Sequence, residues 1–233
     1  MLPKINRETL AEQVTERLME YIVIQQLKAG DLLPSEASLC SSFGVSRPVI
    51  REALKNLEGK RILEIINGKG ALIRPIDSVP LRLFFQRAMQ MEHGTILELM
   101  EVRRGLEVQA AGLAAQRRTA HDLETIRGII QSMRENTADL EAYTHLDVEF
   151  HLQIACASHN TILVYLVESI RDALRNTISA GFQSRGALLR VEAVQRTHEV
   201  LFETIEKGDS KAATQAMLVH FDEAIAALSS PPV

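Results

Sequence analysis

The sequence contains no tryptophan, only two cysteines and no long apolar run. Aromatic residues make up 4% of its 233 residues, so we expect a core built mainly from aliphatic side chains. Cys40 and Cys156 lie far apart and form no metal-type pair, which favours reduced thiols and a cytoplasmic protein. Because no apolar stretch approaches about 18 residues and no signal pattern opens the chain, we expect no membrane-spanning segment.

Basic residues are slightly outnumbered by acidic ones. The 26 Lys and Arg face 30 Asp and Glu, which gives a formal net charge of −4. This charge is unevenly distributed, because residues 45–74 contain seven Lys or Arg and three Glu. That segment therefore carries +4 and leaves −8 on the remainder. A basic segment on an acidic body is the electrostatic footprint of a nucleic-acid-binding protein.

The basic segment lies within a pattern typical of a helix-turn-helix. Ser35 is a favourable N-cap for a short helix, and Gly44 suits the left-handed conformation that often ends one. Ser46 then predicts the cap of a second helix, with Pro48 in its first turn, where a missing N–H does no harm. Two helices joined by a short turn that contains glycine form this motif.

The second predicted helix has two distinct faces. One is apolar and should be buried, and it consists of Ile50, Ala53, Leu54 and Leu57. The other is basic, because Arg47, Arg51 and Lys55 recur every four residues. This basic face is either a solvated surface or a surface that contacts DNA. The N-terminal part of such a helix enters the major groove, where arginine binds two acceptors on guanine or a phosphate.

A predicted β-hairpin follows the second helix and favours the DNA-contacting interpretation. Residues 62–66 and 71–74 have the pattern of strands, and Asn67-Gly68 favours a tight turn between them. A hairpin tipped by glycine and lysine beside such a helix is a wing, whose small residues let the backbone approach DNA while Lys69 contacts phosphate. The complete predicted DNA-binding set is Ser35, Ser46, Arg47, Arg51, Lys55, Asn67, Gly68 and Lys69.

Residues 10–75 resemble the N-terminal winged helix of the GntR family of bacterial transcription regulators. The resemblance rests on Leu-Pro-Ser-Glu at 33–36, Gly-Val-Ser-Arg at 44–47, Val-Ile-Arg-Glu-Ala-Leu at 49–54 and Gly-Lys-Gly at 68–70. It implies that Arg47 and Arg51 contact a double-stranded DNA operator and that Gly68 belongs to the wing tip. Two positions depart from the family pattern. Arg61 stands where glycine is often found, and Ala37 stands where some members have a DNA-contacting basic residue.

The rest of the chain shows only helical periodicity. A helix from Asn6 or Thr9 to about Leu27 should precede the motif, and a proline-bounded linker over residues 76–80 should follow the wing. Beyond the linker, seven helical segments separated by short breaks predict an antiparallel bundle. These segments are 80–91, 94–117, 120–136, 139–157, 160–182, 187–207 and 210–228. The predicted fold is therefore mainly α, with a winged helix-turn-helix domain at 1–75 and an all-helical domain at 81–233.

Three histidines and one aspartate fall on the inward faces of three predicted helices. Asp147 and His151 lie one turn apart on an apolar face, whereas His145 on the same helix should face water. His198 and His220 lie on the apolar stripes of the last two helices. Each histidine alone is commonly a hydrogen-bonded core residue, but a buried carboxylate needs a partner or a cation. Together, three imidazoles and a carboxylate suit a divalent metal ion such as zinc, with nickel or manganese as alternatives.

Residues 81–228 resemble the all-helical FCD effector domain of the FadR subfamily. Seven helices favour this type over the shorter VanR type. The metal-binding members of the subfamily use an Asp-x-x-x-His pair and two further histidines on the last two long helices. The resemblance therefore implies that the metal ligands are Asp147, His151, His198 and His220.

Arg103 interrupts an otherwise apolar stripe, and a buried arginine needs an anionic partner. One candidate is Glu107, one turn away. The resemblance implies instead the carboxylate of a small organic acid that also reaches the metal.

The function predicted from these features is a homodimeric repressor that binds an inverted-repeat operator and is controlled by that effector. Two alternatives remain open at this point. The metal could be purely structural. The protein could instead be a metal-dependent hydrolase fused to a DNA-binding domain, in which an open metal position activates water.

Overall fold

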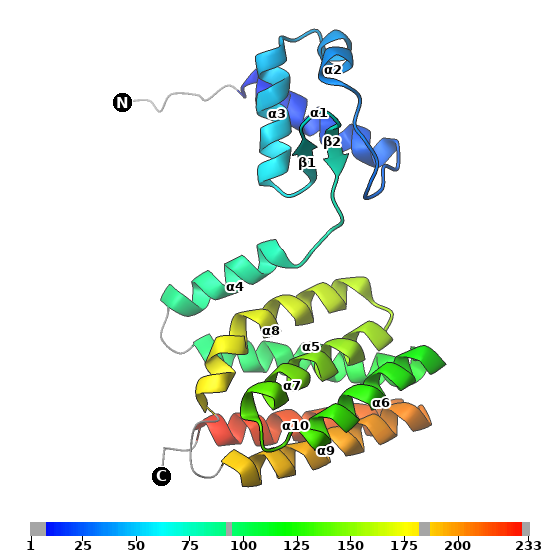
Figure 1. The fold of residues 1–233 in the computed structure, drawn as a ribbon, viewed down its shortest axis with the longest axis vertical. Coiled ribbons are helices and arrows are strands. Elements are labelled where there is room, and N and C mark those ends of the chain that lie inside the picture. Colours follow the sequence, from blue (N-terminus) through cyan, green and yellow to red (C-terminus); the bar gives the residue numbers. More distant parts are fainter. Residues whose placement is uncertain (1–7, 92–94, 182–186, 230–233) are drawn as a thin grey trace. The chain divides into compact units, whose positions relative to one another are not determined.

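The structure is a computed structural model, and it describes residues 8–91, 95–181 and 187–229. Residues 94 and 182, which two predicted helices include, lie outside this range. The chain divides into two compact units, Met1–Asp77 and Ser78–Val233. In the described residues, ten helices accompany a single two-stranded antiparallel hairpin (Figure 1). The prediction of a mainly α fold with one small hairpin is therefore confirmed.

Helix α1, Leu10–Ile24, opens the N-terminal unit. Thr9 caps it, because its side chain accepts a hydrogen bond from the Glu12 amide while the Glu12 side chain accepts one from the Thr9 amide. The helix ends about three residues before its predicted end. The reason is a backbone reversal, because Gln26 adopts a left-handed conformation with φ of 51°.

Helices α2, Glu36–Phe43, and α3, Arg47–Gly59, form the helix-turn-helix. Ser35 caps α2 through a hydrogen bond from the Ser38 amide, and Gly44 ends it with φ of 65°, both as predicted. Ser46 occupies the N-cap position of α3, but its side chain makes no capping hydrogen bond, so that part of the prediction is wrong. The apolar face of α3 is buried as predicted, through Ile50, Ala53, Leu54 and Leu57.

The wing consists of β1, Leu63–Ile66, and β2, Gly70–Ile73. The strands pair from Leu63 opposite Ile73 to Ile66 opposite Gly70, and an isolated bridge joins Leu32 to Leu72. Each strand begins one residue away from its predicted start. The turn needs left-handed backbone at Gly68 and Gly70, whose φ angles are 78° and 107°.

Arg61, just before the wing, also has a left-handed backbone, with φ of 61°. Glycine is the residue that adopts this conformation without strain. The Arg61 guanidinium binds the Asp77 carboxylate, with Nε 3.3 Å from Oδ1, and this contact raises the pKa of Arg61. The base of the wing is therefore attached to the last residue of the N-terminal unit.

The described part of the C-terminal unit contains seven helices, and each of their ends lies within one residue of its predicted place. They are α4, Val79–Met91, α5, Thr95–Arg117, α6, Ala120–Glu135, α7, Leu140–Ala157, α8, Thr161–Gly181, α9, Ala187–Lys207, and α10, Ser210–Ser229. Because α4 begins at Val79, Pro80 lies in its first turn rather than at the end of the linker. Side chains of Thr119, Asp139 and Asp209 accept hydrogen bonds at the starts of α6, α7 and α10.

Helix α5 occupies the centre of the bundle, where it packs against α7, α8, α9 and α10. It packs tightly against α10 at Gly112, whose carbonyl accepts a hydrogen bond from the Ser210 hydroxyl at 2.9 Å. This arrangement brings the inward faces of five helices to one place in the core. Among the described residues, no helix has the length and apolar character needed to cross a membrane.

Candidate metal site and DNA-binding surface

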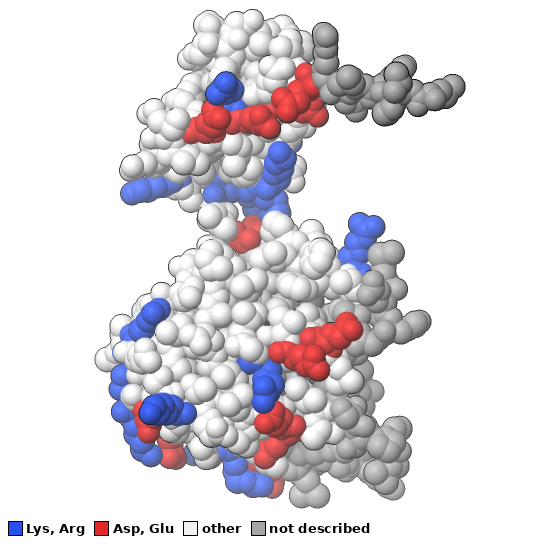
Figure 2. Space-filling model, turned by 180° about the vertical axis from the view of Figure 1, so that it is seen from behind, with Lys and Arg blue, Asp and Glu red and all other residues white. Residues whose placement is uncertain are grey.

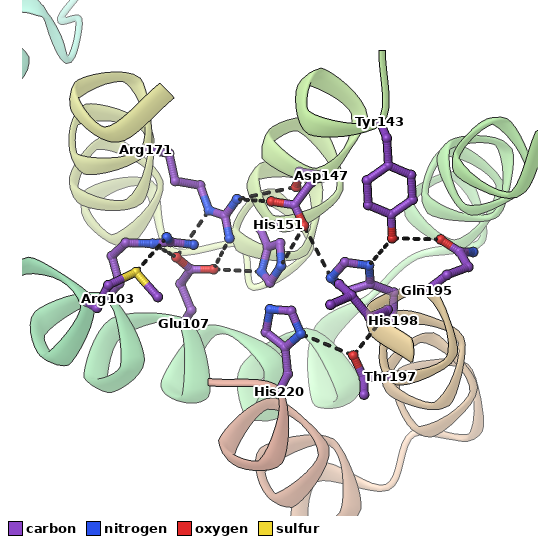
Figure 3. Close-up of polar contacts among 12 residues, drawn as sticks. Arg103, Glu107, Tyr143, Asp147, His151, Arg171, Gln195, Thr197, His198 and His220 are labelled. Atoms are coloured by element: carbon purple, nitrogen blue, oxygen red, sulfur yellow. Dashed lines mark hydrogen bonds and ion pairs between the residues drawn. The ribbon is translucent and has the colours of Figure 1, made fainter. Parts of the chain in front are cut away.

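Three histidines from three helices meet inside the C-terminal unit (Figure 3). His151 comes from α7, His198 from α9 and His220 from α10, and all three are buried. Their ring centres are 4.7–5.3 Å apart. One ring nitrogen of each lies within 4.8 Å of the corresponding atoms of the other two. His145, on the outer face of α7, is exposed as predicted.

Asp147 faces this cluster from one turn before His151. Its Oδ1 lies 3.3 Å from His198 Nε2 and 3.7 Å from His151 Nε2. Both nitrogens are buried, and neither has a hydrogen-bond partner among the described residues. A buried polar atom without a partner is costly, so this point in the core fits a cation that would accept their lone pairs.

The Nδ1 atom of each imidazole contacts a polar side chain on the other side of its ring. These contacts join His151 to a Glu107 oxygen at 2.7 Å, His198 to the Tyr143 hydroxyl at 3.4 Å and His220 to the Thr197 hydroxyl at 3.2 Å. The Tyr143 hydroxyl in turn donates to Gln195 Oε1 at 3.1 Å. Metal-binding histidines are usually held through the nitrogen that does not bind the ion. The arrangement therefore leaves the Nε2 atoms for a ligand.

Burial determines the protonation of the cluster. It lowers the pKa of His151, His198 and His220, that of His198 to about 3, so the imidazoles are neutral near pH 7. Burial alone would raise the pKa of Asp147, but the electrostatic interactions with the neighbouring imidazoles and the Arg171 guanidinium outweigh it and lower that pKa. Neutral imidazoles beside an ionised carboxylate are the protonation states that bind metal ions.

Two buried charged residues support the cluster, and neither was predicted from the sequence to belong to the metal site. Glu107 on α5 and Arg171 on α8 are both 1% exposed, and Arg171 Nη2 lies 2.8 Å from Glu107 Oε2. Arg171 Nη1 also lies 3.4 Å from Asp147 Oδ2. A signal for Arg171 was present in the sequence, since it interrupts the buried stripe of Leu163, Val167 and Ile170.

Arg103 is buried beside the same glutamate. Its Nε lies 2.8 Å from Glu107 Oε1, which is the ion pair that the sequence offered as one of two possible partners for Arg103. Its Nη1 contacts the Met100 sulfur at 3.2 Å, and its guanidinium carbon lies 5.2 Å from the centre of the Phe221 ring. The predicted effector contact of Arg103 stays a prediction.

All of the predicted DNA-binding residues are exposed on the N-terminal unit: Ser35, Ser46, Arg47, Arg51, Lys55, Asn67, Gly68 and Lys69. The basic residues of α3 therefore lie on the face opposite to its buried one. Arg51 Nε contacts both carboxylate oxygens of Glu36, at 3.0 and 3.2 Å. On the side of the molecule drawn in Figure 2, acidic side chains of this unit form a row with a basic side chain beside it, and further basic side chains lie apart from that row.

Comparison with known proteins identifies both units. The model described as bacterial regulatory proteins, gntR family, matches residues 10–73, and the FCD domain model matches residues 98–223. The chain belongs to the GntR family. The HTH-type transcriptional regulator LutR of Bacillus subtilis (strain 168) is 32% identical to it over 200 residues, which cover 84% of this chain and 90% of LutR.

A second relative of this GntR-family protein is the galactonate operon transcriptional repressor of Escherichia coli (strain K12). It is 29% identical over 213 residues, covering 89% of this chain and 91% of the relative. The solved structure named Streptococcus agalactiae GntR matches with a TM-score of 0.73 and 25% identity, covering 93% of this chain and 99% of that one.

These comparisons decide the class of protein. The family and the relatives are transcription regulators and not enzymes. This GntR-family protein is therefore a DNA-binding transcription regulator with an FCD domain, as the sequence predicted, and the hydrolase alternative is set aside. The three imidazoles of its FCD domain form a possible metal site, and their donor atoms fit a divalent transition ion.

Proposed function

We propose that this regulator is a homodimeric repressor whose operator affinity is controlled by a small carboxylate bound beside a divalent metal ion. The charge balance of the buried cluster carries the proposal. Arg103 and Arg171 offset Glu107 and Asp147, and the imidazoles are neutral, so the cluster has no net charge. A divalent ion held by Asp147 and the three histidines would supply two positive charges for an anion.

Arg103 is the second proposed contact of the effector. Among the described residues, Arg103 Nε contacts Glu107, whereas its Nη1 contacts only the Met100 sulfur, a weak acceptor. A carboxylate would be a much better partner, because charge-assisted hydrogen bonds are the stronger ones. The name of the galactonate operon repressor points to a hydroxy acid, and we propose the same chemical class here. The metal is proposed to be zinc, with nickel or manganese as alternatives.

The proposed DNA contacts come from α3 and the wing. Arg47, Arg51 and Lys55 would reach the major groove, while Lys69 would contact phosphate. Each subunit would bind one half of an inverted repeat, which requires a dimer. An exposed apolar surface on α4 supports dimerisation, since Leu83 is 56% and Phe84 66% exposed.

The effector would act by favouring one arrangement of the DNA-binding units over another. To change a DNA-competent population from 99:1 to 1:99, it must prefer the weakly binding arrangement by about 5.5 kcal/mol. Release from the operator upon effector binding is the proposed direction.

A thermal-shift screen of metal-loaded and chelator-treated protein tests the effector part. We expect galactonate or another hydroxy acid to raise the melting temperature of the loaded protein only. At 100 times its Kd a ligand stabilises by about 2.7 kcal/mol. If chelation lowers the melting temperature but no mono- or dicarboxylate, sugar acid or aromatic acid shifts the loaded protein, the metal is purely structural.

Replacing Arg51 by alanine tests the DNA-binding part. We expect Arg51→Ala to weaken binding to an operator selected from random DNA by about 1–3 kcal/mol, because one groove contact is lost. Zinc content should stay the same. The control is Arg17→Ala, which removes an exposed arginine of α1 that pairs only with Glu20 in the described residues. Equal operator affinities for Arg51→Ala and the parent would show that the recognition surface is placed wrongly.

A further inference from the structure

The two buried arginines beside the histidine cluster have different contacts. All three guanidinium nitrogens of Arg171 contact oxygen atoms of the protein, which belong to two carboxylates and one backbone carbonyl. Its Nε and Nη2 bind the two carboxylate oxygens of Glu107 at 3.1 and 2.8 Å, and its Nη1 reaches the Asp147 carbonyl at 3.3 Å and Oδ2 at 3.4 Å. Within the described part of the chain, Arg103 has only its Nε in contact with an oxygen. Arg171 is therefore fully engaged within the protein.

The Arg171 contact determines which oxygen of Asp147 faces the histidines. Because Nη1 holds Oδ2 and the backbone carbonyl of the same residue, the carboxylate cannot rotate freely. Its Oδ1 is left 3.3 Å from His198 Nε2 and 3.7 Å from His151 Nε2. Figure 3 shows Asp147 between the guanidinium on one side and the imidazoles on the other.

Glu107 fixes the orientation of the His151 ring, just as Arg171 fixes the orientation of the Asp147 carboxylate. Its Oε2 lies 2.7 Å from His151 Nδ1, so the ring presents Nε2 toward Asp147 and His198. Arg171 in turn holds both oxygens of Glu107 from α8. Two neighbouring side chains of α7 are therefore oriented by one ion pair formed between α5 and α8.

We propose that Glu107 and Arg171 are a positioning pair that prepares Asp147 and His151 for metal binding, an inference that rests on the proposed metal site. Neither residue would coordinate the ion, because Glu107 contacts Nδ1 of His151 and Arg171 contacts Oδ2 of Asp147. The pair acts through the orientation of the ligands, and residues of this kind change metal affinity by about 10- to 100-fold when they are replaced. The alternative role is purely structural, in which each charge only neutralises the other in the core.

The test is the zinc affinity of Glu107→Gln and of the double variant Glu107→Gln/Arg171→Met, measured by competition with a chromophoric chelator. The double variant removes one charge of each sign, so it keeps the net charge of the core and avoids an unpaired buried arginine at position 171. We expect both variants to bind zinc about 10- to 100-fold more weakly than the parent. The visible spectrum of the cobalt-loaded protein should change as well, because it reports the geometry of the ligands.

Matched controls come from exposed positions on α5. Glu101→Gln makes the same chemical change on an exposed side chain, and Arg104→Met removes an arginine whose partner is Asp222 at the surface. Both controls should keep the parent zinc affinity and cobalt spectrum. Circular dichroism and the melting temperature identify any variant that fails to fold, and affinities are compared between folded proteins.

The outcomes separate this inference from the proposed function. If the double variant binds zinc as tightly as the parent, with the same cobalt spectrum, the pair is only structural and the inference is wrong. If the parent binds zinc but no carboxylate, the effector proposal fails while the affinity comparison still decides the role of the pair. A parent protein that binds no divalent ion overturns both.

Discussion

At the scale of single residues, the main feature is the protonation of the buried histidines. A charged imidazole loses favourable hydration when it is buried, so burial favours the neutral form. His151, His198 and His220 all have pKa values below that of an exposed histidine for this reason. The unfolded chain exposes the same rings to water, where they protonate near pH 6.5. Stability must therefore depend on pH.

The sign of this dependence follows from proton counts. Between about pH 6.5 and the lowered folded pKa, which is about 3 for His198, the unfolded chain binds more protons than the folded one. The stability of the metal-free C-terminal unit should thus be fully present above pH 6.5 and decrease as the pH falls. Each such imidazole contributes up to about 1.4 kcal/mol per pH unit.

Urea unfolding of chelator-treated protein between pH 7.5 and 5 measures this slope. The exposed His145 provides the control, because His145→Ala should leave the slope unchanged while His198→Ala should reduce it. A free energy of unfolding that stays constant over this range would contradict neutral burial of the three rings.

At this scale, helical spacing in the sequence was enough to predict which side chains of the cluster point inward. It placed Asp147, His151, His198 and His220 on inward faces, and the structure brings them together. Spacing identifies the face of a helix but not the helix that lies opposite. Arg171 therefore could not be paired with Glu107 and Asp147 before the packing was known.

At the scale of elements, α5 shows how one helix combines an exposed surface with a tightly packed one. Gly105 is exposed, and a Cβ atom placed there would meet no atom within 4 Å. Gly112 faces α10, where a Cβ atom would lie 2.7 Å from Thr214 Oγ1 and 3.3 Å from Ser210 Oγ. The same substitution should therefore have opposite effects at two positions of one helix.

We expect Gly105→Ala to stabilise the C-terminal unit by about 0.5–1 kcal/mol, because alanine favours the helix and loses less backbone entropy on folding. Gly112→Ala should destabilise it by about 1–3 kcal/mol, because the added methyl group would overlap Thr214 Oγ1 and force that side chain or α10 to shift. Urea unfolding of both variants gives the two values. Similar changes at the two positions would show that α5 and α10 are not packed as described.

Element boundaries were predictable where a capping residue marks them. Ser35 accepts the expected hydrogen bond, and Gly44 ends α2 in a left-handed conformation. The end of α1 was not predictable, because the left-handed residue there is Gln26 and not a glycine. The strands were displaced by one residue because their ends depend on the register with the neighbouring strand.

At the scale of the whole molecule, the chain separates two tasks between its two units. A positively charged segment, residues 45–74, carries most of the proposed DNA-contacting residues, and the acidic remainder includes the proposed metal and effector site. The attraction between a basic surface and DNA weakens as the salt concentration rises. The central claim is that a ligand of the second unit changes the operator affinity of the first.

The most direct test is the operator affinity of zinc-loaded protein as the concentration of a hydroxy acid such as galactonate increases, measured by fluorescence anisotropy at constant salt. His198→Ala, checked for folding and for loss of zinc, is measured in parallel. The account predicts that the acid releases the parent protein from its operator and has no effect on His198→Ala. Operator binding by the parent that does not change with any acid bound at the metal site would contradict it.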